Sequence, residues 1–150
     1  MKIALKYGLL ITAAIAAWTI TVHLLIRDPN SRIHSLGTML FFNLIQFAGI
    51  YFGIRAKERE IQGKLAFKDA VKTGVSISYV FAVAASLFFV CVLLIAGTGF
   101  MKGEPGAQAL PQWLLLIQAF TGLFLGSMLF GLAYSTLISF AIARRKVEAT

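Results

Sequence analysis

The chain carries little charge. Asp, Glu, Lys and Arg together make up 13% of its 150 residues, about half the share found in a typical soluble domain. Apolar residues make up 59%, and burying that excess inside one globule of this size would leave too little polar surface for solubility. These proportions exclude a soluble enzyme, a secreted disulfide scaffold and a disordered tail. An integral membrane protein remains.

Cysteine and acidic residues are also scarce. The single cysteine, Cys91, lies in an apolar run and cannot form an intramolecular disulfide. Six acidic residues against fourteen basic ones give a net charge of +8. The basic residues lie at the ends of apolar runs, which is typical of membrane topology and of contact with anionic lipid. Because no basic stripe alternates with exposed aromatic residues, nucleic acid is not expected as a partner.

Four uncharged runs are long enough to cross a bilayer, which takes roughly 20 apolar residues in a helix. The expected spans are residues 7–26, 33–54, 73–101 and 111–143. Pro105 and Gly106 make the start of the last uncharged run a loop, whereas Pro111 suits the first turn of a helix. The sequence therefore predicts an all-α, polytopic integral membrane protein: one membrane domain over residues 1–150, built as a bundle of four transmembrane helices.

A cleavable signal peptide is the alternative for the first run. Lys2 and Lys6 would form its basic region, and residues 14–16 its small-residue cleavage site. The apolar stretch continues to Ile26, so a cut there would leave a hydrophobic tail of half a span. We therefore expect an uncleaved first helix.

The distribution of basic residues predicts the orientation. Positive residues accumulate in cytoplasmic loops, and with four spans both termini share a side. Eleven Lys and Arg residues fall in the termini and the middle loop, and three fall in the other two loops. We expect both termini in the cytoplasm.

A weak internal repeat marks the starts of two spans. Residues 5–9 (LKYGL) resemble residues 71–75 (VKTGV), and the second and fourth spans both end in basic clusters. This pattern is typical of two tandem helical hairpins of one orientation. Because any two cytoplasmic helix starts share a lysine, chance explains the similarity equally well.

Small residues recur at intervals of three or four positions, most clearly in the last span. In lipid they let two helix backbones approach and gain van der Waals contact. We expect this packing inside one four-helix bundle, and the alternative is a homo-oligomer or another membrane protein as partner. The predicted packing face contains Gly122, Gly126, Gly131 and Ser135.

Three amide side chains lie within the spans. Asn43 and Gln46 share one face near the centre of the second span, and Gln118 lies in the fourth. They are expected to bond across helices, and the alternative is that they line a polar cavity. No charged residue lies deep in any span, which argues against proton-coupled transport.

No catalytic or metal site is expected. His23, His34 and Asp28 flank the first short loop and could in principle hold zinc or copper, but nothing fixes their geometry. The sequence has no nucleophile elbow, HExxH motif or phosphate-binding loop. We therefore expect no cofactor, no metal and no enzymatic activity.

The middle loop is the most distinctive segment, because apolar residues alternate there with lysines. It is expected to begin the third helix as an amphipathic turn at the headgroups, with its aromatic ring inserted and its lysines toward anionic lipid phosphate. An ordinary positive connector is the alternative. The residues of this interfacial loop are Gly63, Lys64, Phe67, Lys68, Lys72 and Gly74.

This loop also carries a family resemblance. Glu60, Gly63, Leu65, Phe67, Ala70, Lys72 and Gly74, followed by a long apolar run, resemble domain of unknown function family 4199, a family of largely bacterial membrane proteins. Residues 6–8, the length and the four-helix layout are similar too. Members of that family tend to have two glycines where this chain has Gln62 and Gly63. The resemblance implies the four-helix fold and, as the compartment, the inner membrane of a bacterium, but it implies no reaction.

Three classes of function follow from these observations. The favoured one is a non-enzymatic membrane protein of structural, accessory or partner-binding type. A small transporter or channel component would require the three amide side chains to converge on one polar cavity. A membrane enzyme would require the two histidines and Asp28 to cluster.

Overall fold

The computed structural model describes residues 2–25, 32–62, 65–96 and 111–147. Within these ranges the chain forms four α-helices and no strand. The helices are α1 (Lys2–Leu25), α2 (Arg32–Glu60), α3 (Phe67–Ala96) and α4 (Gln112–Val147). Each contains a stretch that is long and apolar enough to cross a membrane. The predicted all-α architecture with four membrane-spanning helices is confirmed.

Every one of the four helices continues past its uncharged run at the end that is rich in basic residues: α1 begins at Lys2, α2 ends at Glu60, α3 begins at Phe67 and α4 ends at Val147. Charged residues end an apolar run, but in water they can continue a helix by pairing along its surface. In α2, Arg55 Nη1 contacts Glu58 Oε2 at 2.8 Å and Lys57 Nζ contacts Glu60 Oε2 at 2.7 Å. Charge therefore marks where the membrane would end rather than where the helix does.

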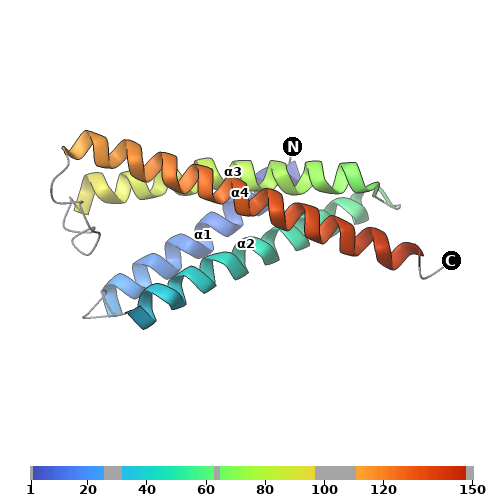
Figure 1. Cartoon of the computed structure of the whole chain (residues 1–150), viewed down its shortest axis with the longest axis horizontal. Coiled ribbons are helices and arrows are strands. Elements are labelled where there is room, and N and C mark those ends of the chain that lie inside the picture. The colour runs from blue at the N-terminus through green and yellow to red at the C-terminus, as the bar shows by residue number, and fades with distance from the viewer. Residues whose placement is uncertain (1, 26–31, 63–64, 97–110, 148–150) are drawn as a thin grey trace.

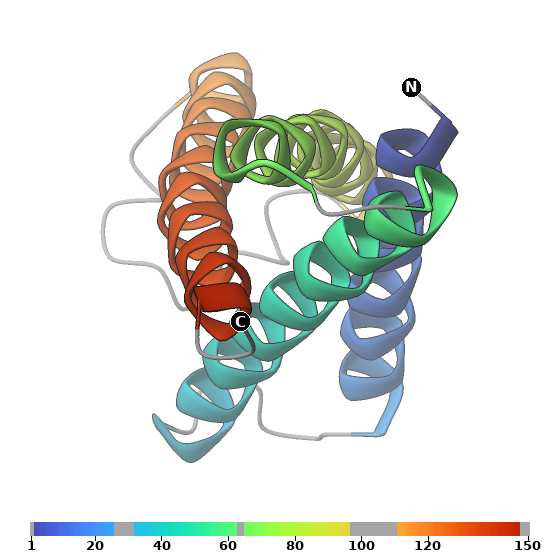
Figure 2. The ribbon, with the colours of Figure 1, turned by 90° about the vertical axis from the view of Figure 1, so that its right-hand side faces the viewer.

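The helices form two antiparallel hairpins that lie at an angle to each other (Figure 1). One hairpin contains α1 and α2, and the other contains α3 and α4. The hairpins approach each other at the end where α2 finishes and α3 begins. They diverge toward the opposite end, and the view along the long axis shows the same arrangement (Figure 2). The bundle is consequently closed at one end and open at the other.

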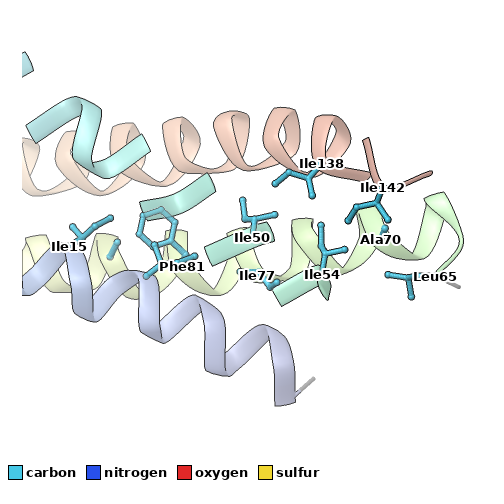
Figure 3. Packing of buried hydrophobic residues seen from close by; sticks show 11 residues of the cluster. Ile15, Ile50, Ile54, Leu65, Ala70, Ile77, Phe81, Ile138 and Ile142 are labelled. Carbon is cyan, nitrogen blue, oxygen red and sulfur yellow. The ribbon is translucent and has the colours of Figure 1, made fainter. Parts of the chain in front are cut away.

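The hydrophobic core lies mainly toward the closed end. Isoleucines from all four helices interdigitate there, together with side chains from the start of α3 (Figure 3). Burying each such side chain contributes on the order of 1.5–3 kcal/mol where water is the alternative, and within a bilayer close packing supplies the stabilisation instead. The core residues are Ile11, Ile15, Ile50, Ile54, Leu65, Ala70, Ile77, Phe81, Ala85, Ile138 and Ile142.

Helices α3 and α4 cross through two reciprocal contacts between small residues. A methyl group added at Gly74 would overlap Ser135, and one added at Gly131 would overlap Ser78. The hydroxyls of both serines donate to backbone carbonyls of their own helix, Ser78 to Gly74 at 2.9 Å and Ser135 to Gly131 at 2.6 Å. Because all four residues are small, the two backbones can approach closely at these contacts, and neither the Ser78 nor the Ser135 hydroxyl is left unpaired.

An aromatic pair holds α1 to α2 away from the closed end. The Trp18 and Phe41 rings stack with their centroids 4.2 Å apart, and Trp18 Nε1 donates to Thr38 Oγ1 at 3.3 Å. These contacts keep the first hairpin together where it diverges from the second. The divergence therefore opens a space between hairpins rather than within one.

The turn that follows α2 contains a residue with left-handed backbone geometry. Gln62 has φ of 48° and is exposed, and its N–H donates to the Arg59 carbonyl at 3.2 Å. Glycine adopts this conformation without the steric cost that a side chain brings. At this position the family resemblance implies a glycine.

A candidate binding cleft between helices α2 and α4

The divergence of the hairpins leaves a cavity of about 320 Å³, which we call the α2–α4 cleft. Helices α2 and α4 form its two sides, and α1 and α3 close its floor. Its size falls in the range of sites that bind small molecules. It is lined by Ile15, Thr38, Met39, Phe42, Asn43, Gln46, Phe81, Ala85, Phe89, Gly122, Leu123, Gly126, Ser127 and Phe130.

Two of the three predicted amide side chains meet in this cleft. Asn43 Oδ1 accepts a hydrogen bond from Tyr134 Oη at 2.5 Å, and Gln46 Nε2 donates to the Ser127 carbonyl at 2.8 Å. Both bonds join α2 to α4, so the amides bond across helices and also line the cavity. Gln118 lies on an exposed part of α4 and is not among the residues that line the cleft.

The predicted packing face of α4 divides into two parts. Gly131 and Ser135 lie in the contact with α3 described above, and both are buried. At Gly122 and Gly126 the structure differs from the prediction, because a methyl group added there would meet no atom within 4 Å. Both glycines instead line the cleft. The hairpins diverge at this level, so no neighbouring helix covers this face of α4.

The interfacial loop divides in a similar way. Phe67 is 45% exposed at the first position of α3, and Lys68 and Lys72 are exposed. Gly74 is buried against Ser135, so it belongs to the helix contact rather than to the surface. Gly63 and Lys64 lie outside the described residues. Exposure of an aromatic ring beside two lysines is compatible with contact to headgroups.

No titratable side chain is among the described residues that line the cleft. Tyr134 bonds to Asn43, which lines the cleft, but Tyr134 does not line the cavity itself. Amide and hydroxyl groups can orient a bound molecule, but they neither hold a charge nor exchange protons near neutral pH. Among the described residues there is no group of three His, Cys, Asp or Glu side chains that could hold a metal ion. Asp28 and the side chains of His23 and His34 lie outside the described part of the chain.

A second groove follows α2 and α4 toward the closed end. It has a volume of about 390 Å³, and Phe47, Tyr51 and Arg55 line it on the side of α2. Side chains of α4 between 137 and 142 form the other wall. Arg55 closes the groove at its charged end and is paired with Glu58. The groove is therefore mainly apolar along its length, and the positive charge of Arg55 at its end is neutralised by Glu58.

Sequence reasoning overlooked Tyr134. A tyrosine in the middle of an apolar run needs a partner for its hydroxyl, and Asn43 in the second span was the available acceptor. Tyr134 also contacts two neighbouring rings, with its centroid 5.6 Å from that of Phe47 and 6.1 Å from that of Phe130. The signal was present, but pairing the two residues required knowing that α2 and α4 are neighbours.

The apolar helices define the chain as a multi-pass membrane protein. Residues 6–103 match the family described as protein of unknown function (DUF4199), and the chain belongs to this family. The matched region contains α2, α3 and all of α1 but its first four residues, whereas α4, which forms one side of the cleft, lies beyond it. Searches of curated proteins and of solved structures find no match.

Proposed function

We propose that this chain is a non-enzymatic, partner-binding protein of the bacterial inner membrane, and that the α2–α4 cleft is where it binds. The observation that carries the proposal is the uncovered surface at Gly122 and Gly126. A bilayer does not leave a cavity of about 320 Å³ beside two helices empty. Something fills it, either a lipid-soluble molecule or side chains of another membrane protein.

The chemistry of the lining favours binding over reaction. The walls are apolar and aromatic, with a few uncharged polar groups at one place, which is the usual composition of a ligand site. A nucleophile would need an adjacent base to activate it, and no such base is among the described residues that line the cleft.

The basic residues support an orientation with both termini in the cytoplasm. Eleven Lys and Arg residues belong to the termini and the middle loop, and a loop of this kind is retained inside. On this orientation Lys68 and Lys72, both exposed, face the anionic lipid of the inner leaflet. The cleft then opens toward the outer leaflet, since the hairpins diverge at the end opposite to the middle loop (Figure 1).

A transporter or channel component is the second candidate. Asn43 and Gln46 support it because they line a cavity within the span. Gln118 does not join them, so the polar surface is smaller than a hydrophilic pathway would need. Binding without transport accounts better for a cavity whose walls are mainly apolar.

Photo-crosslinking in native membranes tests the proposal. A small diazirine side chain replaces Gly122 in the cleft, and in the control it replaces Leu132, which is exposed on α4 outside the cleft. We expect a discrete adduct from position 122 and only heterogeneous lipid from position 132. An adduct that raises the mass of the protein by several kilodaltons identifies a protein partner. An adduct that raises it by a few hundred daltons identifies a small molecule. Identical lipid products from both positions would contradict the proposal.

A further inference from the structure

Two polar side chains in the cleft have hydrogen-bonding atoms that the protein does not use. Gln46 is 5% exposed and Ser127 is 8% exposed, and both line the cavity. Gln46 Nε2 donates to the Ser127 backbone carbonyl at 2.8 Å. Within the described part of the chain, Gln46 Oε1 and Ser127 Oγ make no hydrogen bond. The Gln46 carbonyl oxygen and the Ser127 hydroxyl therefore remain available for hydrogen bonds, on two residues that already contact each other.

Ser127 differs in this respect from Ser78 and Ser135 at the α3–α4 contact. Within the described residues, Ser86 and Ser139 also have unpaired hydroxyls, but both are fully buried and neither lines the cleft. Ser78 and Ser135 donate to the carbonyl four residues earlier in their own helices, as serines in transmembrane helices commonly do. Ser127 makes no equivalent bond to Leu123. Because a polar group without a partner is costly in hydrocarbon, this hydroxyl and the Gln46 carbonyl favour a bound molecule that satisfies both.

The depth of this pair restricts the choice of molecule. Gln46 lies ten residues into the span Leu36–Glu60, and Ser127 lies fifteen residues into the span Gln112–Arg144. At a rise of 1.5 Å per residue these positions are about 15 Å and about 22 Å along their helices, near the middle of the hydrocarbon. Phospholipid headgroups stay at the interface. The molecule must instead carry its polar group into the hydrocarbon itself.

The walls of the cleft favour a ring. Four phenylalanines line it, and the Phe42 and Phe89 rings lie with their centroids 6.4 Å apart. Aromatic rings pack well against one another in offset or tilted arrangements. A cavity of about 150 Å³ can hold benzene, so about 320 Å³ has room for a single substituted ring.

We propose that the α2–α4 cleft binds a neutral, lipid-soluble phenol or quinol. Its hydroxyl donates to Gln46 Oε1 and accepts from Ser127 Oγ, its ring lies among the phenylalanines, and its apolar tail leaves through the open side of the cleft. A hydrocarbon could satisfy neither group and a ketone only the serine. The ligand is neutral because the described residues that line the cleft include no charged side chain. This inference rests on the proposed function, that the cleft is a binding site.

A pair of probes that differ by one hydroxyl tests it. The full chain is placed in phospholipid nanodiscs, and 4-heptylphenol and heptylbenzene are titrated while the thermal unfolding midpoint is followed. We expect 4-heptylphenol to bind about ten-fold more tightly, since one hydroxyl makes two hydrogen bonds in a dry site. Ser127→Ala keeps the carbonyl that Gln46 contacts and should weaken 4-heptylphenol about five-fold without changing heptylbenzene. Thr136→Ala, which removes an exposed hydroxyl bonded to the Leu132 carbonyl, should change neither.

The outcomes separate the two proposals. Gly122→Leu fills the cleft and should abolish binding of both probes. If it leaves both unchanged, the cleft is not the site, and the proposed function and the phenol inference both fail. Equal affinity for the two probes would overturn only the phenol inference, because the cleft would then accept any apolar molecule. If Ser127→Ala leaves the preference for 4-heptylphenol intact, the hydrogen bonds are assigned wrongly and the polar pair holds water.

Discussion

Adding one methyl group at Gly131 and, separately, at Gly122 distinguishes the packed part of α4 from the open part. A Cβ at Gly131 would overlap Ser78 and lie 3.2 Å from Gln46 Nε2, whereas a Cβ at Gly122 would meet nothing within 4 Å. Both substitutions exchange glycine for alanine inside the same helix. Any gain in helix propensity, up to about 1 kcal/mol, is therefore common to both, and the difference between them reports the steric contact.

Overpacking a well-packed contact typically costs about 1–3 kcal/mol. We therefore expect Gly131→Ala to have a free energy of unfolding about 1–3 kcal/mol lower than that of Gly122→Ala. The measurement is unfolding of the purified protein in mixed micelles by titration with SDS, followed by circular dichroism. Gly131→Leu should be more disruptive still, and more so than Leu132→Gly at an exposed neighbouring position. Equal unfolding free energies for the two alanine variants would refute the assignment of the α3–α4 contact.

Three further predictions concern the ends of the helices. Eleven basic residues lie in the termini and the middle loop, and three lie in the other two loops. This predicts that tags at both termini are cytoplasmic and that a tag in residues 101–111 is external. Labelling of a cysteine placed at either terminus by an impermeant reagent in intact cells would contradict this. Replacing Lys64, Lys68 and Lys72 together by glutamine should make the start of α3 more accessible to protease in inverted vesicles that contain anionic lipid. Each lysine near an anionic surface contributes about 1 kcal/mol to the attraction between the segment and the membrane. Equally slow cleavage with and without anionic lipid would show that protein contacts hold the segment. Gln62→Gly should raise the free energy of unfolding by up to about 1 kcal/mol by relieving the left-handed backbone, and a loss of stability in the same SDS titration would show that the glutamine side chain stabilises the turn.

The four helices could be predicted because their signal is local. A run of uncharged residues long enough to span hydrocarbon is visible without knowledge of any neighbour. The extension of α2 to Glu60 was missed because the same charges that end the apolar run also pair along the helix surface. Hydropathy therefore reports where the membrane boundary lies, whereas ion pairs along the surface of the helix decide where the helix ends.

The cleft could not be predicted because it depends on where two hairpins diverge. Gly122 and Gly131 follow the same pattern of small residues, yet one lines an open cavity and the other contacts α3. The spacing defines a face of the helix, whereas the neighbour along that face is decided by distant contacts such as the stack of Trp18 on Phe41. Likewise, Asn43 and Gln46 were recognised as polar residues on one face, but their partners on α4 became evident only from the structure.

Native mass spectrometry tests most directly whether the α2–α4 cleft is a binding site. The wild-type chain and Gly122→Leu are purified from their native membrane under gentle conditions, and the mass of each intact protein is recorded. The wild type should retain a bound molecule of defined mass, and Gly122→Leu should lose it while keeping the same helical content. If the wild type carries no bound molecule, or if Gly122→Leu retains the same mass, the cleft is not a binding site.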